Sequence, residues 1–195
     1  MPSPIAHSLI GICLGASSNE GIINIFQKKY LNYLLIIFIS VTPDLDVIPG
    51  FFVGLPTKYH HGITHSFFSA IIFGLLFSYL IYIFKKKYIF ARFLLFAIIC
   101  SFHIIFDLFS IDTGEVNGFG MPIFFPFSSF LYRSSVSLFS SSLTKDGYLT
   151  INSIIRYSNL FPIIIEIFLS LLVGILIVVI VKFLNYKRTY SLKKE

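Results

Sequence analysis

Long apolar runs separated by short polar or basic stretches are the main pattern of this chain. A helix that crosses a bilayer needs about 20 mostly apolar residues. Three runs meet this length, at residues 66–84, 88–109 and 160–184. A shorter run, 31–41, extends to a span over 31–48 if Asp44 and Asp46 lie at its end. The pattern predicts an all-α fold, a multi-pass transmembrane helical bundle with four to five membrane segments.

Two other parts of the chain are apolar without forming a complete span. Residues 4–16 are too short to cross alone, so we expect 4–26 to be either half of a span or a short re-entrant segment. Residues 111–159 are rich in Ser, Phe, Gly and Pro, which predicts a long loop on the outer membrane face. The whole chain, 1–195, is expected to be a single integral membrane domain with a basic cytoplasmic tail at 185–195.

The composition supports the membrane interpretation. Hydrophobic residues make up 56% of the chain and charged residues only 12%, about half the share of a typical soluble domain. The net charge of +6 does not predict nucleic-acid binding, because the basic residues gather at the ends of the apolar runs. The expected partner is the lipid bilayer. Cys13 and Cys100 both fall in apolar segments and are expected to be buried free thiols.

The basic clusters also predict the orientation in the membrane. Cytoplasmic loops carry an excess of Lys and Arg, and three clusters would share one side: Lys28 and Lys29; Lys85, Lys86 and Lys87; and Lys182, Lys187, Arg188, Lys193 and Lys194. The C-terminus is then cytoplasmic, and the connections 44–65 and 111–159 face outward. Glu166, near the outer end of the last span, could line the site or reach the membrane interface, and the second is expected.

All five histidines stand at predicted outer ends of membrane segments. His7 begins the first apolar segment, and three more precede the span that starts at Ser66, namely His60, His61 and His65. Each of these has a simpler explanation, such as a polar terminus, a solvated loop pair or a helix start. His103 and Asp107 differ, because ionisable residues inside an apolar segment are rare and usually functional. Their i, i+4 spacing puts both on one helical face, where they can reach one metal ion.

Imidazoles and carboxylates are the usual ligands of zinc and related ions at hydrolytic centres. The candidate ligands are His7, Asp44, His60, His65, His103 and Asp107. This set exceeds the needs of one tetrahedral zinc and allows one or two divalent ions, with zinc as the first choice. Asp44 and Asp46 face the same way only in an extended backbone. One carboxylate is therefore expected to bind metal while Asp46 orients a histidine or acts as general base.

These motifs together resemble a known family. The ordered set comprises Ala6-His7, Pro43-Asp44-Leu45-Asp46, His60-x-Gly62-x-Thr64-His65-Ser66, His103-x-x-x-Asp107 and the later segment 120–126. Over residues 4–130 it is similar to the YdjM-like, membrane-bound metal-dependent hydrolases. The resemblance implies a hydrolase in the bacterial cytoplasmic (inner) membrane. His61 departs from the family pattern, which has an arginine there, so a phosphate-binding cation is replaced by a titratable imidazole.

The leading hypothesis is metal-dependent hydrolysis of a phosphoester, in a lipid or lipid-linked substrate, at the outer face. A metal ion would lower the pKa of bound water, Asp46 and His61 would be the catalytic residues, and His61 or Lys58 would contact the phosphate. An apolar wall for acyl chains is expected from Phe67, Phe68, Phe124 and Phe125. Two alternatives remain open: a non-catalytic scaffold with a structural metal site, and a metal or proton transporter. The sequence does not predict the oligomeric state.

Overall fold

The computed structural model describes residues 2–54, 56–110, 120–139 and 157–192, and within them every regular element is helical. This confirms the all-α prediction. The α-helices are α1 (Pro4–Ser17), α2 (Glu20–Ile23), α3 (Lys29–Val41), α4 (Val47–Phe52), α5 (Phe67–Lys85), α6 (Ile89–Leu108) and α8 (Tyr157–Leu192). Three short 3-10 helices join them, namely η1 (Thr42–Asp46), η2 (Pro56–Tyr59) and η3 (Ile63–His65).

Four helical stretches are long and apolar enough to cross a membrane, which confirms a multi-pass bundle. They are Lys29–Phe52, Phe67–Lys85, Ile89–Leu108 and Ile163–Lys187. The first stretch combines α3, η1 and α4. The 14 residues of α1 are apolar but shorter than these spans. Of the predicted outer loop, residues 111–119 and 140–156 lie outside the described part of the chain.

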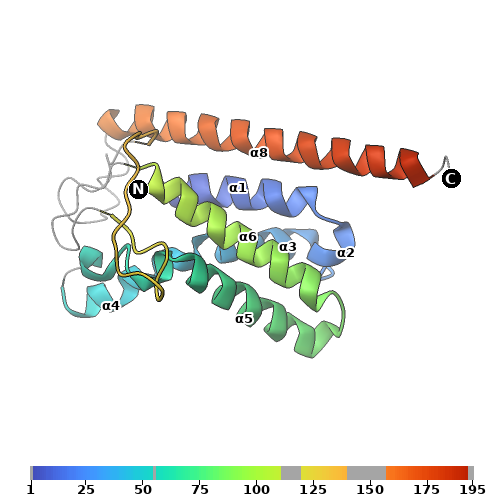
Figure 1. Cartoon of the computed structure of the whole chain (residues 1–195), viewed down its shortest axis with the longest axis horizontal. Helices are drawn as coiled ribbons and strands as arrows, with labels where there is room; N and C mark the ends of the chain where they lie inside the picture. Colours follow the sequence, from blue (N-terminus) through green and yellow to red (C-terminus); the bar gives the residue numbers. More distant parts are fainter. Residues whose placement is uncertain (1, 55, 111–119, 140–156, 193–195) are drawn as a thin grey trace.

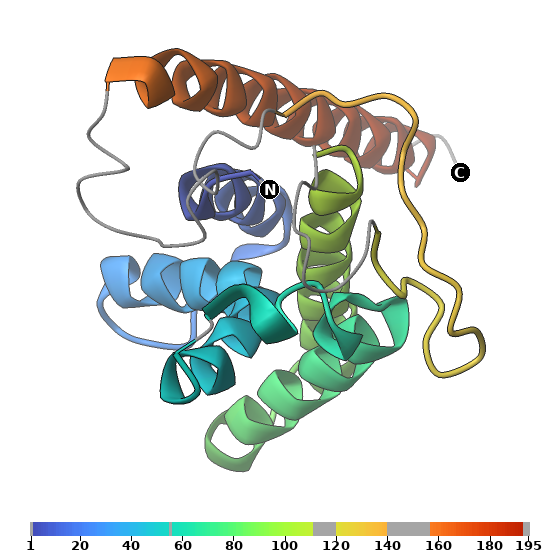
Figure 2. The ribbon, with the colours of Figure 1, turned by 90° about the vertical axis from the view of Figure 1, so that its left-hand side faces the viewer.

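Helix α1 lies inside the bundle. It packs against α8 on one side and against α3 and α6 on the other, while α5 packs against α6 (Figures 1 and 2). The fully buried side chains include Ile10 of α1, Ile36 and Ile39 of α3, and Phe96 and Ile99 of α6. These apolar contacts fix the short α1 against two spans.

Small residues allow the helices to approach closely, as is common in membrane proteins. A Cβ atom added at Gly74 of α5 would lie 2.9 Å from both the Cβ and the backbone nitrogen of Ala97 in α6. A Cβ atom added at Gly11 of α1 would lie 2.7 Å from the Cβ of Ser40 in α3. Ser40 is thereby held directly against α1.

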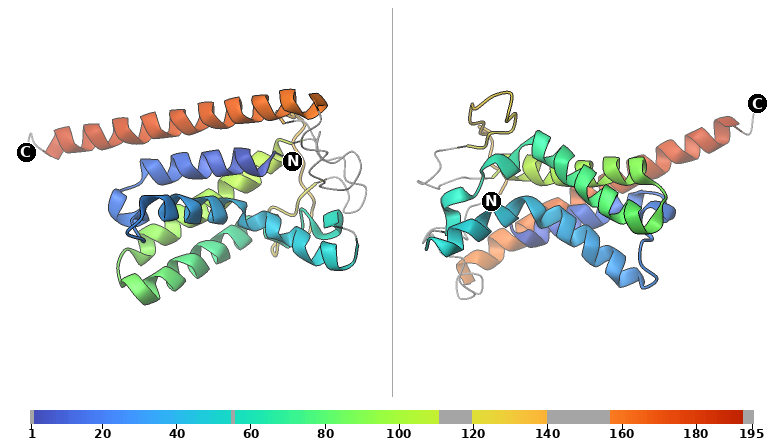
Figure 3. Two further views of the ribbon diagram at one scale, coloured as in Figure 1. Left: turned by 180° about the vertical axis from the view of Figure 1, so that it is seen from behind. Right: turned by 90° about the horizontal axis from the view of Figure 1, so that it is seen from below.

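Short helical turns and helix ends gather at one end of the bundle. The N-terminus of α1, the turn η1 and the C-terminal end of α6 meet there, together with η2, η3 and the segment 120–139 (the left-hand end in Figure 1; both views of Figure 3). Pro43 stands in the first turn of η1, where a proline ring is tolerated. The backbone N–H of Phe67 donates to the Ile123 carbonyl at 3.0 Å, and this bond ties the segment 120–139 to the start of α5.

Candidate metal centre

Four polar side chains from three separate elements converge at this end of the bundle. Asp44 comes from η1, His65 from the end of η3, and His103 and Asp107 from the last two turns of α6. One ligand atom from each lies within 4.8 Å of those of the other three. We call Asp44, His65, His103 and Asp107 the buried quartet. The i, i+4 spacing within α6 supplies half of it.

The distances within the buried quartet are short. His103 Nε2 lies 3.0 Å from Asp107 Oδ2 and 3.2 Å from Asp44 Oδ1. His65 Nε2 lies 3.4 Å from Asp107 Oδ2 and 3.5 Å from Asp44 Oδ1. Both imidazoles therefore direct their Nε2 atoms at the same two carboxylates.

These atoms fit a bound cation better than they fit one another. Although these atoms are close together, their hydrogen-bonding capacity is not satisfied among the described residues. This holds for the Nε2 atoms of His65 and His103 and for both carboxylate oxygens of Asp44 and of Asp107. Leaving a buried polar atom unsatisfied costs about 1–3 kcal/mol, and more for a charged group. A divalent cation at the point where the atoms converge would satisfy all of them together. The donor set, two imidazole nitrogens and two carboxylates, suits zinc or a related ion.

The other ring nitrogen of each imidazole has a partner that fixes the ring. His103 Nδ1 lies 2.7 Å from the backbone carbonyl of Ser40, which can only accept a hydrogen bond. In the neutral ring, Nδ1 therefore carries the proton, and Nε2 has the lone pair that can bind a metal ion. His65 Nδ1 lies 3.1 Å from Asp46 Oδ2. Carbonyls and carboxylates behind metal-binding histidines typically orient the ring in this way.

Asp46 has different neighbours from Asp44, although both belong to η1. Asp46 Oδ1 lies 3.0 Å from His60 Nδ1, and Asp46 Oδ2 accepts a hydrogen bond from the Thr64 hydroxyl at 2.7 Å. The turn is a 3-10 helix rather than an extended strand, so the two carboxylates diverge. Asp44 faces the other members of the buried quartet, whereas Asp46 faces His60, Thr64 and the Nδ1 atom of His65.

His7 borders the buried quartet. Its ring stacks on that of His103 with the centroids 3.8 Å apart, and its Nε2 lies 3.5 Å from Asp107 Oδ1. The side chain is fully buried, and neither ring nitrogen has a hydrogen-bond partner among the described residues. His7 therefore lies beside the buried quartet but is not one of its four members.

The charge balance of the site also favours a cation. Burial alone lowers the pKa of His65, but the nearby carboxylates of Asp107, Asp44 and Asp46 outweigh burial and raise this pKa well above its ordinary value. The surroundings of His65 therefore stabilise positive charge, supplied either by a proton or by a metal ion.

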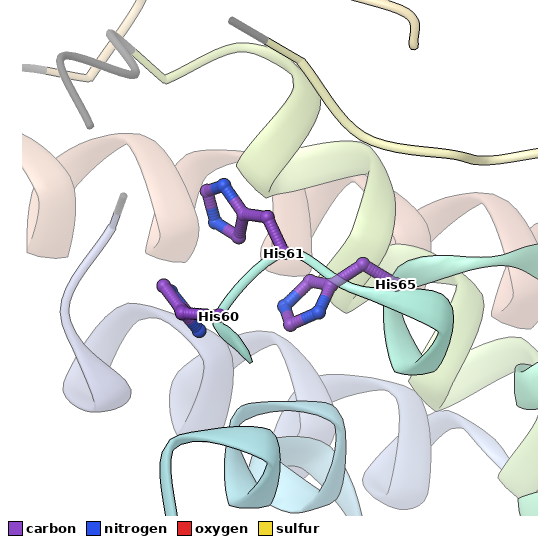
Figure 4. Close-up of side chains that lie close together, drawn as sticks. All are labelled: His60, His61 and His65. Atoms are coloured by element: carbon purple, nitrogen blue, oxygen red, sulfur yellow. The ribbon is translucent and has the colours of Figure 1, made fainter. Parts of the chain in front are cut away.

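A second group of histidines lies beside the buried quartet. His60, His61 and His65 surround one small space (Figure 4), and one nitrogen from each lies within 4.8 Å of the others. His65 belongs to both groups. The structure thus brings together all the residues that the sequence singled out as candidate ligands or catalytic residues: His7, Asp44, Asp46, His60, His61, His65, His103 and Asp107.

The expectation that Glu166 reaches the membrane interface is wrong. Glu166 is only 1% exposed, and its Oε2 accepts a hydrogen bond from the backbone N–H of Ser3 at 2.8 Å. Helix α8 presents this side chain to α1 rather than to the surface. The contact holds the residues just before α1 and, through them, the position of His7.

We expect Glu166→Leu to destabilise the protein by about 1 kcal/mol, because the Ser3 N–H loses its buried acceptor. Glu166→Gln keeps an oxygen that can accept the same bond and serves as the matched control. Thermal unfolding in detergent measures both variants. Equal stability of the Leu and Gln variants would show that the contact with Ser3 has no structural importance.

Among the described residues, the two cysteines are free thiols. Cys100 is buried, as predicted, but Cys13 is only partly buried. The aromatic residues of segment 120–139 pack against the start of α5, with the rings of Phe67 and Phe124 6.1 Å apart and those of Phe68 and Phe127 6.3 Å apart. Phe124 also contacts Tyr132 edge-on. These rings remain exposed in spite of the contacts, with Phe124 47% and Phe127 87% exposed.

Fold and site together define a multi-pass helical membrane protein with a buried histidine and aspartate cluster that could bind metal. The chain belongs to the YdjM inner membrane protein family, whose model matches residues 1–188. This confirms the resemblance seen in the sequence and supports a membrane location. Neither the curated proteins nor the solved structures compared with the chain contain a match.

Proposed function

We propose that this protein is a membrane-bound, metal-dependent hydrolase that acts on a phosphoester carried by a lipid. The observation that carries the proposal is the convergence of buried ligand atoms without hydrogen-bond partners among the described residues, from Asp44, His65, His103 and Asp107. These four residues would hold a divalent ion, with zinc as our first choice. When bound, such an ion supplies Lewis acidity, polarising a phosphoryl oxygen and making a water more acidic.

The remaining residues have separate tasks in this proposal. Asp46 orients His60 and His65 and is the general base, because its carboxylate also borders an open pocket. Lys58, which is exposed on η2, supplies a positive charge for the substrate phosphate. The distribution of basic residues in the sequence favours a site that opens on the outer face of the membrane.

An apolar pocket beside Asp46 supports a lipid substrate. It has a volume of about 680 Å³ and is lined by Thr42, Leu45, Asp46, Pro49, Tyr59, Ile63, Thr64 and Phe73. The polar side chains of Asp46 and Thr64 also contact the site, while the rest of the lining is mainly apolar. A phosphate at the site and an acyl chain in this pocket would match both surfaces. This pocket replaces the wall of Phe67, Phe68, Phe124 and Phe125 as the proposed acyl-chain surface.

The test compares zinc-dependent hydrolysis of a long-chain lipid phosphomonoester with that of p-nitrophenyl phosphate, which has no acyl chain. Ile63→Trp should fill part of the pocket and raise KM for the lipid about tenfold. This is the loss expected if roughly two methylene groups of the acyl chain are no longer buried. The variant should leave KM for p-nitrophenyl phosphate unchanged. Leu80→Trp, an exposed position of α5 outside the pocket lining, is the control.

A structural metal site is the second candidate function. The complete burial of His7, His65 and His103 favours it, because structural metal sites are closed. The side chain of Asp44 is 13% exposed, but both of its carboxylate oxygens are buried, which also fits a closed site. Metal binding without hydrolysis of either phosphoester would rule out the hydrolase and support the structural site.

A further inference from the structure

The histidine group beside the buried quartet has the geometry of a second site. The ring centroids of His60 and His61 lie 4.2 Å apart, those of His61 and His65 4.9 Å apart, and those of His60 and His65 5.2 Å apart. Figure 4 shows the three rings around a common space. His60 and His61 are consecutive residues, so their rings can lie this close only with a particular backbone conformation.

The backbone of His61 has an unusual conformation that allows this arrangement. Its φ of 59° lies in the left-handed region, which costs roughly 1–2 kcal/mol for a residue with a Cβ atom. The following Gly62 closes a tight turn in which its N–H donates to the Tyr59 carbonyl at 3.2 Å, and a Cβ atom there would lie 2.8 Å from that oxygen. Such strain persists where the surrounding structure fixes it, often at binding sites.

The chemical surroundings favour a cation over three clustered imidazoles alone. His60, His61 and His65 are 9%, 7% and 0% exposed, so water has little access to them. The carboxylate of Asp46 lies 3.0 Å from His60 Nδ1 and 3.1 Å from His65 Nδ1, which places a negative charge at the edge of the group. Imidazoles with one carboxylate form a donor set for zinc, copper, nickel or iron rather than for magnesium or calcium.

We propose that His60, His61 and His65, with Asp46 beside them, bind a second divalent transition-metal ion next to the ion of the buried quartet. His65 lies between the two sites, because its Nε2 faces Asp44 and Asp107 while its Nδ1 faces Asp46. To bind both ions, the ring would release its Nδ1 proton when the second ion binds, as metal ligands generally do. His61 is then a metal ligand rather than a contact for the phosphate. The inference rests on the proposed metal centre and not on hydrolysis. Two adjacent ions are a common arrangement in enzymes that cleave phosphoesters.

The experiment measures zinc bound per protein at saturation, by mass spectrometry of the metal after removal of free ions. Wild type should bind two equivalents, as two-metal sites do. His61→Asn should retain one, since Asn tolerates the left-handed backbone and removes the imidazole. His60→Gln should also retain one, whereas Lys58→Asn, a neighbouring change outside the histidine group, should retain two.

A single equivalent in saturated wild type would overturn the second site, whatever the variants do. Two equivalents in folded His61→Asn and His60→Gln would overturn it as well. Cobalt substitution gives an independent readout, because each of the two variants should lose about half of the visible absorption of the cobalt-loaded wild type. Two bound ions without hydrolysis would contradict the proposed function but not this site, and hydrolysis with one bound ion would contradict only this site.

Discussion

Replacing Asp107 with Asn is expected to lower zinc affinity by at least about 100-fold. Asp107 lies within 3.5 Å of ring nitrogens from three histidines, His7, His65 and His103, and its side chain is fully buried. The binding free energy of structural zinc is about 10–16 kcal/mol, so each of four ligands contributes roughly 3 kcal/mol. Losing one such contribution raises the Kd about 100-fold. Asn has the same shape as Asp but lacks its charge, so the variant tests charge rather than packing.

Competition with a chromophoric chelator measures this affinity in detergent. Ser101→Ala is the matched control on α6, because within the described part of the chain the Ser101 hydroxyl donates to the Ala97 carbonyl of its own helix, at 2.8 Å. The control should bind zinc as tightly as wild type. If Asp107→Asn bound zinc as tightly as wild type, Asp107 would not be a ligand of the metal centre.

Asp46→Asn is expected to weaken zinc binding about 10- to 100-fold without abolishing it, the usual effect of losing a group that orients metal-binding histidines. The Asp46 carboxylate serves His60 through one oxygen and His65 through the other. Asn keeps only one acceptor oxygen, and its NH₂ group would face a ring N–H. One of the two imidazoles therefore loses its orientation.

Thr64→Val is the comparison for Asp46→Asn. It removes the hydroxyl that donates to Asp46 at 2.7 Å but leaves both histidine contacts of that carboxylate in place. We expect a smaller loss of affinity than in Asp46→Asn, measured by the same competition. The same hydroxyl lies 3.2 Å from His65 Nδ1, so equal losses in the two variants would indicate that Thr64 orients the site as strongly as Asp46 does.

The sequence predicts the half of the site that lies on one regular helix. His103 and Asp107 share a face of α6 because their spacing matches the helical repeat, and their presence in an apolar run marks them as functional. The multi-pass helical architecture follows equally directly from the length of the apolar runs. Local periodicity is sufficient for both conclusions.

The rest of the site depends on contacts between distant segments. The divergence of Asp44 and Asp46 follows from a 3-10 turn, whereas alternating residues suggest a shared face only in an extended chain. The carbonyl of Ser40 fixes the ring of His103, and a backbone group leaves no trace in the sequence. Ser40 reaches this position because Gly11 allows α1 to lie close to α3.

Glu166 belongs to a pattern that does indicate how α8 is rotated. Glu166, Ser170 and Gly174 recur at intervals of four residues, which puts them on one helical face, and all three are buried. A Cβ atom added at Gly174 would lie 2.5 Å from the Sγ of Cys13 in α1, so this face of α8 is the one that packs against α1. The pocket beside Asp46 cannot be predicted in this way, because its lining comes from five separate elements.

The most direct test of the central claim, that the buried quartet is a metal centre, is the metal content of the protein purified in detergent without chelators. Wild type and Ser101→Ala should carry about one or two equivalents of a transition metal, and His65→Ala and Asp107→Ala should lose the ion of the buried quartet. Metal-free wild type after both gentle purification and incubation with zinc would contradict the claim. The histidines and aspartates would then have to be explained by helix packing or proton binding.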